Sequence, residues 1–296
     1  MSLDASSLAA FEPHRPRLLR VAYRMLGTLS DAEDLVQDAY LRWHETDRDA
    51  VAAPEGLLVK TVVRLAIDRL RRLKRERAHY HGQWLPEPWL GDAGAARGDE
   101  LGYAASVLLE RLGPDERAAF LMREVFDLDY AQVAEILEKT EAASRKLVQR
   151  AKEHLADPAS APARAPVTSE AKQLLLEQLV AASRAESAEA LERMLTEAAH
   201  MISDGGGKVF AARYPLEGAH HIADTLWRIK RKNGPRMVER VVDLDGEPAI
   251  VAWVDGVLFG VTYAEVRGGV VTGLYMVVNP DKLIRVAARF PAPARA

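Results

Sequence analysis

The sequence predicts two helical domains followed by a cone-shaped α+β domain. From Leu8 to Leu155, apolar residues recur at helical spacing, with one long interruption between residues 79 and 99. A Pro/Ala-rich spacer, residues 157–168, ends this part of the chain. Beyond the spacer, β-rich runs alternate with Asp-Gly and Gly-Gly pairs, which are strong hairpin signals. A length of 296 residues accommodates two or three such units.

The first domain, residues 1–78, is expected to hold three helices. Ser30 is predicted to cap the second helix, with Glu33 completing a capping box, and Pro54 to open the third. The third helix has a buried stripe made of Val62, Val63, Ala66, Ile67 and Leu70. Residues 79–99 are rich in Gly, Pro and Trp and are interpreted as a linker.

The second domain, residues 100–156, is expected to hold four helices, the last two forming a helix-turn-helix. Asp129 is predicted to cap the first helix of the pair, and small Ala134 allows a close crossing. The second helix then presents polar and basic side chains on positions expected to be exposed: Ser144, Arg145, Lys146, Gln149, Arg150 and Lys152. An ordinary helical hairpin with a solvated basic face is the alternative interpretation.

The third domain, residues 169–290, is expected to begin with helices and end in an antiparallel meander. Helices are predicted at about 170–182, 187–196 and 218–231. Strands are predicted at 199–203, 209–212, 237–244, 249–254, 257–266 and 270–277.

Charge is strongly segregated within the first domain. Residues 31–55 contain eight acidic and two basic residues, whereas residues 60–77 contain eight basic and two acidic ones. The acidic helix cannot bind DNA, while the basic helix is expected to turn Arg64, Arg71, Lys74 and Arg75 outward, toward phosphates. Solvated charged faces are the alternative interpretation of both helices.

Composition excludes several classes of site. The chain has no cysteine, so disulfides, thiolate zinc sites and cysteine nucleophiles are ruled out. No stretch reaches the length of an apolar membrane span, and no signal-peptide pattern opens the chain. We therefore expect a cytoplasmic protein with no metal, no cofactor and no membrane partner.

The order of acidic helix, basic helix, linker and helix-turn-helix resembles the extracytoplasmic-function sigma factors of bacterial RNA polymerase. The string GTLSDAEDLVQDAYLRW, residues 27–43, is similar to the family's polymerase-clamp-binding helix, and AIDRLRR, residues 66–72, to its minus-ten-reading helix. The helix-turn-helix is similar to the domain that reads the minus-thirty-five element. The chain departs from the family pattern at Leu57-Leu58 and Arg64-Leu65, where Trp-Leu and Arg-Asn pairs are usual.

The resemblance implies binding to promoter DNA and to the beta-prime clamp and beta flap of core RNA polymerase. The polymerase-binding residues it implies are Asp31, Glu33, Asp34, Gln37 and Asp38. For the minus-ten element it implies Arg64, Asp68, Arg71, Arg72, Lys74 and Arg75. For the minus-thirty-five element it implies Ser144, Arg145, Lys146, Gln149 and Arg150.

Three strings are similar to those of the subgroup with a fused SnoaL-like, NTF2-fold domain: WLPEP, DGGGK and NPDKL. In that subgroup the extra domain is thought to regulate in cis, in place of a separate anti-sigma factor. Their prolines and glycines restrict the backbone or permit close approach, so we expect the strings to meet at one regulatory interface. The residues of that interface are Trp84, Leu85, Pro86, Glu87, Pro88, Asp204, Gly205, Gly206, Gly207, Lys208, Asn279, Pro280, Asp281, Lys282 and Leu283.

Two other functions remain open from the sequence. A stand-alone helix-turn-helix regulator would bind a palindrome as a dimer, but the acidic helix would then have no role. An NTF2-fold enzyme would need converging ionisable groups in its cone, for which Asp204, His220 and His221 are candidates. No acid-base pair is recognisable, so we expect no catalysis, and a small-molecule ligand in the cone pocket is left open.

Overall fold

The computed structural model describes residues 5–47, 51, 53–90, 101–156 and 168–293. The chain forms two compact units, Met1–Ala78 with Ala105–Ala161, and His79–Ala104 with Pro162–Ala296. The expected linker of residues 79–99 therefore groups with the C-terminal domain. Residues 91–99 of that linker, and 157–167 of the second expected linker, lie outside the described residues.

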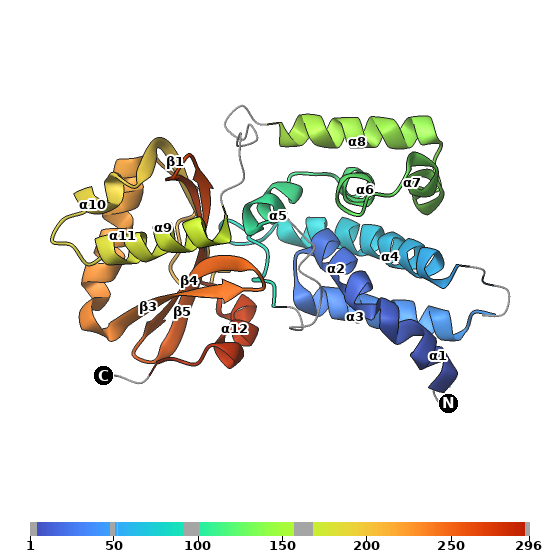
Figure 1. Cartoon of the computed structure of the whole chain (residues 1–296), viewed down its shortest axis with the longest axis horizontal. Coiled ribbons are helices and arrows are strands. Elements are labelled where there is room, and N and C mark those ends of the chain that lie inside the picture. Colours follow the sequence, from blue (N-terminus) through green and yellow to red (C-terminus); the bar gives the residue numbers. More distant parts are fainter. Residues whose placement is uncertain (1–4, 48–50, 52, 91–100, 157–167, 294–296) are drawn as a thin grey trace. The chain divides into compact units, whose positions relative to one another are not determined.

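The first unit begins with helices α1 (Ala5–Phe11), α2 (Arg15–Leu26), α3 (Leu29–His44) and α4 (Pro54–Arg77) (Figure 1). The start of α4 at Pro54 and its buried stripe are confirmed. The prediction of three helices is wrong, because the short helix α1 precedes the other three. The Ser30 cap is also wrong: Gly27 ends α2 with a φ of 78°, so the chain re-enters a helix at once and Thr28 becomes the N-cap.

The same unit continues from Ala105, within α5 (Tyr103–Leu109), through α6 (Pro114–Phe120), a π-helical turn (Leu121–Val125), α7 (Tyr130–Leu137) and α8 (Glu141–Leu155). The Asp129 cap is confirmed: its carboxylate accepts the Gln132 N–H at 2.8 Å, and the Gln132 side chain accepts the Asp129 N–H at 3.0 Å. Glu138, with a φ of 53°, makes the tight turn between α7 and α8.

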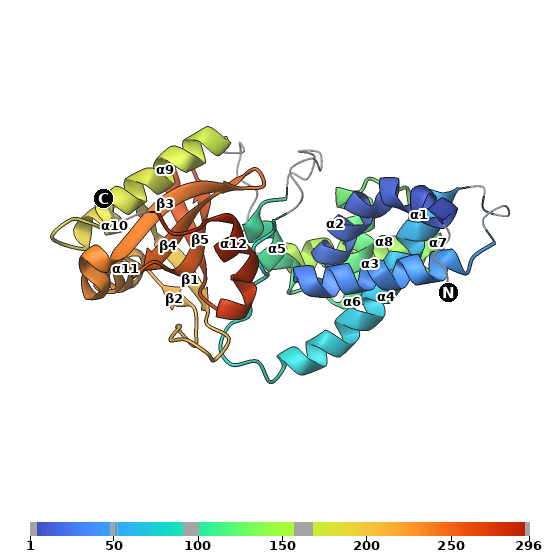
Figure 2. The ribbon, with the colours of Figure 1, turned by 90° about the horizontal axis from the view of Figure 1, so that it is seen from below.

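The second unit is built on a six-stranded sheet in the order β2-β1-β6-β5-β4-β3. Strands β1 and β6 are parallel, and every other neighbouring pair is antiparallel. The strands are β1 (Leu195–Asp204), β2 (Leu216–Glu217), β3 (Met237–Leu244), β4 (Glu247–Val254), β5 (Val257–Arg267) and β6 (Val270–Val277). Helices α9 (Ser169–Ala182) and α11 (Ala219–Asn233) pack against the sheet, as Figures 1 and 2 show, and α10 (Glu189–Glu192) and α12 (Ile284–Arg289) are short.

Two predicted elements of this unit are wrong. Residues 209–212 form no strand: the Ala212 N–H bonds to the Ser203 hydroxyl at 2.9 Å and not to a strand backbone. Phe210 in this segment is 100% exposed. The helix predicted at 187–196 shrinks to the single turn of α10, since β1 already begins at Leu195 and pairs with Val271 of β6.

Candidate functional site

The outer face of α3 is acidic, as the sequence predicts. Asp34, Gln37 and Asp38 are exposed, and Glu33 is half-buried. Asp31 differs, because its carboxylate accepts two hydrogen bonds from Arg69 of α4, at 2.6 and 3.0 Å. The bond to Asp31 raises the pKa of the Arg69 guanidinium above its ordinary value. Asp31, which the resemblance assigns to polymerase binding, thus joins α3 to α4.

Helix α4 presents only part of its predicted DNA-reading face to solvent. Asp68, Arg71, Arg72 and Arg75 are exposed. The expectation that Arg64 and Lys74 face outward is wrong, because both turn toward the second helical domain.

Arg64 donates from Nε to the Ile136 carbonyl at 3.1 Å and pairs with Glu138 at 2.6 Å. Lys74 donates to the Leu112 carbonyl at 2.5 Å, and burial lowers its pKa below the ordinary lysine value. Two of the cationic side chains assigned to the minus-ten element, those of Arg64 and Lys74, are thus bound to polar groups of the second helical domain.

Further charged pairs extend this interaction along α4. Lys60 pairs with Glu135 at 2.8 Å, and Arg71 with Asp115 at 3.0 Å. We call the whole set, with the bonds of Arg64 and Lys74, the α4 contact. Its most buried part is Arg117, which is 1% exposed and pairs with Glu110 at 2.6 Å, and Glu110 also pairs with Arg77 of α4 at 2.6 Å.

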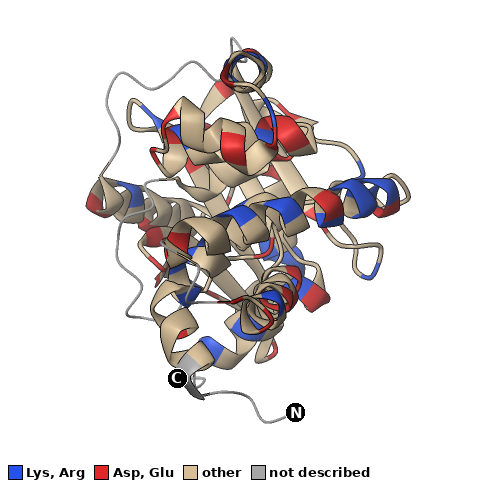
Figure 3. Ribbon diagram, turned by 90° about the vertical axis from the view of Figure 1, so that its right-hand side faces the viewer, with Lys and Arg blue, Asp and Glu red and all other residues tan. Residues whose placement is uncertain are grey.

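The second helix of the helix-turn-helix, α8, exposes Arg145, Lys146, Gln149 and Arg150. Basic and acidic positions are interspersed along the helices (Figure 3). Arg145 lies 4.1 Å over the Tyr130 ring and pairs with Glu141 at 3.3 Å, so it is held in place. The expected exposure of Ser144 is wrong: the residue is fully buried, and its hydroxyl bonds to the Thr140 carbonyl at 3.1 Å.

The three strings WLPEP, DGGGK and NPDKL meet within the second unit, around the fully buried carboxylate of Asp204. Asp204 accepts hydrogen bonds from the Leu85 N–H at 2.9 Å and from Lys282 Nζ at 2.6 Å. Lys282 also donates to the Leu85 carbonyl at 2.5 Å. Each string thus contributes one member of a buried, charge-assisted network. We call this network, with Tyr80 and Asn279, the motif cluster.

Aromatic rings complete the motif cluster. Lys282 Nζ lies 4.0 Å from the Trp84 ring and 5.2 Å from the Tyr80 ring. The Tyr80 hydroxyl donates to Asp204 at 2.6 Å and accepts from the Asn279 amide at 2.9 Å. Burial, and then the bond to Asp204, raise the pKa of Tyr80 above its usual value.

The close approach at the motif cluster requires a glycine. Gly206 has a φ of 61°, and a Cβ there would lie 2.3 Å from Asn279 Nδ2. Tyr80 was not predicted as a member of the cluster. It lies 124 residues from Asp204 along the chain, and no sequence motif links the two residues.

Just beyond the expected linker of residues 79–99, Tyr103 is also attached to the C-terminal domain. Tyr103 stacks on the Tyr263 ring at 3.9 Å, and its N–H donates to the Glu247 carboxylate at 2.5 Å. The Tyr103 hydroxyl donates to the Pro86 carbonyl at 2.6 Å, which joins Tyr103 to the WLPEP string. No motif in the sequence indicates this attachment.

The remaining candidate residues lie at the surface of the unit or away from its pocket. Lys208 pairs with Asp281 at 2.6 Å, and both side chains are more than half exposed. His220 and His221 are exposed on α11 and do not line the pocket found in this unit.

Among the described residues, no group of His, Asp and Glu is arranged to hold a metal ion. In the same part of the chain, no helix has the length and apolar character needed to cross a bilayer.

Comparison with known proteins agrees with this arrangement. The family model for sigma-70 region 2 matches residues 10–76, and the model for sigma-70 region 4 matches residues 104–155. The chain is 32% identical to the ECF RNA polymerase sigma factor SigJ of Mycobacterium tuberculosis, over 93% of this chain and 92% of that protein. It is 27% identical to the probable ECF RNA polymerase sigma factor SigI of the same species, over 93% and 94%.

The crystal structure of Mycobacterium tuberculosis SigJ is also similar, with a TM-score of 0.75 and 31% identity over 93% of this chain and 98% of that one. The predicted fold class, two helical sigma domains followed by an NTF2-like α+β domain, is thereby confirmed. The chain belongs to the extracytoplasmic-function family of RNA polymerase sigma factors.

Proposed function

We propose that this sigma factor binds core polymerase through the exposed acids of α3 and reads promoter DNA with α4 and α8. We further propose that its C-terminal domain regulates it in cis. As a family member, the chain directs promoter-specific transcription initiation. It catalyses nothing itself, since polymerase supplies the chemistry, and it acts in the cytoplasm, where that polymerase is found.

The single observation that carries the regulatory proposal is the α4 contact. Arg64 and Lys74 cannot bind phosphates while they bind carbonyls and carboxylates of the second domain. Promoter binding therefore requires the two helical domains to separate, and DNA phosphates then replace Glu135 and Glu138 as partners of the α4 cations.

The C-terminal domain is suited to control this separation. The segment that joins the two helical domains is attached to it at one end through Leu85 and at the other through Tyr103. A linker fixed at two points limits how far the domains it joins can move. We propose that the beta-prime clamp and the beta flap bind the two domains once this limit is relaxed.

Run-off transcription with purified core polymerase tests the proposal. Three chains are compared: the full protein, one ending before Asn279 and one ending near residue 165. If the domain only inhibits, both shorter chains transcribe more strongly than the full protein. If it also assists polymerase, the chain ending before Asn279 is activated and the shorter one is impaired. Equal activity of all three would contradict regulation in cis.

Charge reversal separates polymerase binding from folding. We expect D34K/D38K to lose co-purification with core polymerase while its far-UV circular dichroism is unchanged, because both acids are exposed. Unchanged co-purification would overturn the assignment of α3.

Reading of the minus-thirty-five element is tested on α8. R145A should cost about 1–3 kcal/mol at the preferred base pair and relax preference there. An equal loss at every promoter sequence would make Arg145 a phosphate contact only.

A further inference from the structure

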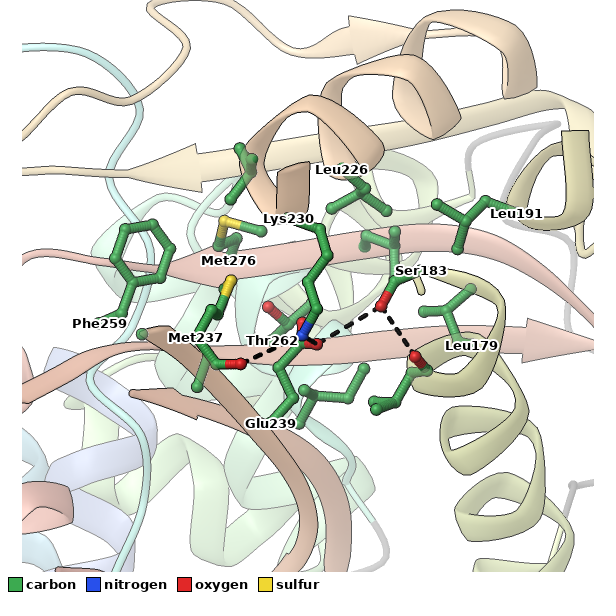
Figure 4. Close-up of a pocket in the computed structure, with 16 residues that line it drawn as sticks. Leu179, Ser183, Leu191, Leu226, Lys230, Met237, Glu239, Phe259, Thr262 and Met276 are labelled. Atoms are coloured by element: carbon green, nitrogen blue, oxygen red, sulfur yellow. Dashed lines mark hydrogen bonds and ion pairs between the residues drawn. The ribbon is translucent and has the colours of Figure 1, made fainter. Parts of the chain in front are cut away.

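The loop that joins β1 to β2, residues 205–215, presents two aromatic rings to solvent. Phe210 is 100% exposed and Tyr214 is 69% exposed. We call this segment the aromatic loop, and Figure 2 shows it beside β2, at the edge of the sheet. Its rings are no part of the apolar pocket of the same domain, which is lined from α9, α10, α11 and strands β3 to β6 (Figure 4).

The aromatic loop is held at its base although its rings are exposed. The Ala212 N–H bonds to the Ser203 hydroxyl at 2.9 Å, and the Gln83 amide donates to the Arg213 carbonyl at 3.2 Å. Ala211 packs against the hydrophobic core of the domain. A loop fixed in this way loses little conformational entropy when a partner binds, so its exposed rings are suited to making contacts.

The charge of the aromatic loop favours nucleic acid. The loop contains Lys208 and Arg213 and no acidic residue, although the chain as a whole has a net charge of −3. The Arg213 guanidinium is exposed, lies 5.9 Å from the Tyr214 ring, and pairs with no carboxylate of the described residues. Lys208 pairs with the exposed Asp281, which a phosphate can replace.

The combination of rings and cations selects a single strand over other partners. A base stacks on an aromatic side chain only when it is separated from its neighbouring bases, so the rings of the loop cannot stack on the bases of a duplex. A stable protein interface buries about 800 Å² on each partner, and its core is depleted of charged residues. One loop that alternates rings with cations offers neither that area nor that composition.

We propose that the aromatic loop binds single-stranded nucleic acid, with Phe210 and Tyr214 stacked on bases and with Lys208 and Arg213 on phosphates. Its role in transcription rests on the proposed function, because melted promoter DNA is the single strand that a sigma factor meets. The binding itself needs neither polymerase nor a promoter sequence. Its failure would therefore leave the assignments of α3, α4 and α8 untouched.

Fluorescence anisotropy of the full chain with a labelled thymidine oligonucleotide of about eight nucleotides tests the proposal. F210A should weaken binding about tenfold, which corresponds to about 1.4 kcal/mol of lost stacking, and should leave the salt dependence unchanged. R213Q should weaken binding about threefold and reduce the slope of log K against log salt by about 0.7, the value for one phosphate contact on a single strand. Binding to a double-stranded hairpin should be unaffected by F210A.

Two control variants match these changes elsewhere in the same domain. I284A removes another exposed apolar side chain, and R228Q another exposed arginine. Neither should change binding of the oligonucleotide. Because Phe210 and Ile284 are both exposed, neither substitution threatens the fold, and circular dichroism checks this.

Photo-crosslinking locates the binding site, because α4 and α8 also carry exposed cations. The probe is the same oligonucleotide with one iodouracil, a base that crosslinks to aromatic side chains stacked on it. We expect crosslinks in the tryptic peptides 209–213 and 214–228. Crosslinks confined to α4 or α8, or equal effects of F210A and I284A, would overturn the proposal. Unchanged oligonucleotide binding by F210A, together with lost co-purification of core polymerase, would overturn it in favour of a protein partner.

Discussion

The α4 contact and the motif cluster both join segments far apart in sequence, but they differ in how far their charged side chains are exposed to solvent. In the α4 contact, the carboxylates of Glu135 and Glu138 are 70% and 71% exposed. In the motif cluster, the side chains of Asp204 and Lys282 are 0% and 8% exposed. Exposed ion pairs contribute little to the free energy of unfolding and are screened by salt, whereas removing one partner of a buried pair is strongly destabilising.

This difference assigns separate roles to the two regions. In the proposed mechanism the α4 contact opens, because water and DNA phosphates can replace its exposed carboxylates. In that mechanism the motif cluster stays intact, because its members are buried together, and the linker remains bound to the C-terminal domain. The pairing of Glu110 with Arg77 and with the buried Arg117 is the part of the α4 contact that we expect to resist opening most.

The largest expected effect comes from breaking the motif cluster. D204A leaves the Lys282 ammonium buried without its carboxylate and should lower the free energy of unfolding of the C-terminal domain by about 3–5 kcal/mol. The matched control D281A removes the exposed partner of Lys208 and should cost at most about 1 kcal/mol. Urea unfolding of the full chain measures both, and equal costs would contradict the distinction between buried and exposed ion pairs on which the comparison rests.

A smaller effect is expected from the aromatic side of the same cluster. Y80F removes a donor to Asp204 and an acceptor for Asn279, at a cost of about 1–3 kcal/mol in the same unfolding assay. Y214F changes a tyrosine that is 69% exposed and should be neutral. If the two substitutions behave alike, Tyr80 only fills space.

Reversing charge in the α4 contact should open it without unfolding the chain. E135K/E138K places like charges opposite Lys60 and Arg64, and should strengthen binding of the free chain to promoter DNA several-fold. The control D127K/E153K adds the same charge elsewhere in the second helical domain. The prediction fails if both double variants bind DNA equally well in an electrophoretic mobility shift assay.

The smallest effect is a pH dependence of the α4 contact. The hydrogen bond from Lys60 lowers the pKa of Glu135 below its ordinary value of 4.5. A depressed carboxyl pKa means that this stabilisation is present above pH 4.5 and is lost as the pH falls through the lower, folded value. Amide exchange in α7 should therefore rise on acidification in the wild-type chain, and less so in K60M, which lacks the partner. An identical pH profile for the two proteins would contradict this role of Glu135.

Local signals in the sequence predicted much of the fold. The helix cap at Asp129 and the Asp-Gly hairpins at Asp245 and Asp255 depend on neighbouring residues only, so their residue types are sufficient evidence. The strand predicted at 209–212 failed because β character without a pairing strand gives no ladder. The predicted exposure of Ser144 was wrong because the helical phase places it on the buried face, one turn after Thr140, and a polar side chain can be buried there once its hydroxyl bonds to the Thr140 carbonyl.

The partners of charged groups were the least predictable part of the site. A basic helix face has the same sequence whether it faces solvent, DNA or another domain, so the engagement of Arg64 and Lys74 could not be read from α4 alone. The motif cluster was anticipated through resemblance to a subgroup with the same three strings. Tyr80 and Tyr103, which lie outside those strings, were missed.

The separation of the two helical domains is measured most directly by pulsed electron resonance between spin labels. The chain has no cysteine, so labels attach only at introduced positions, and R72C on α4 with A131C on α7 are exposed sites on facing domains. For the free full chain we predict one short, narrow distance distribution, which moves to longer distances when core polymerase binds. A broad or long distribution in the free chain, or the same short distance in the polymerase complex, would contradict the account.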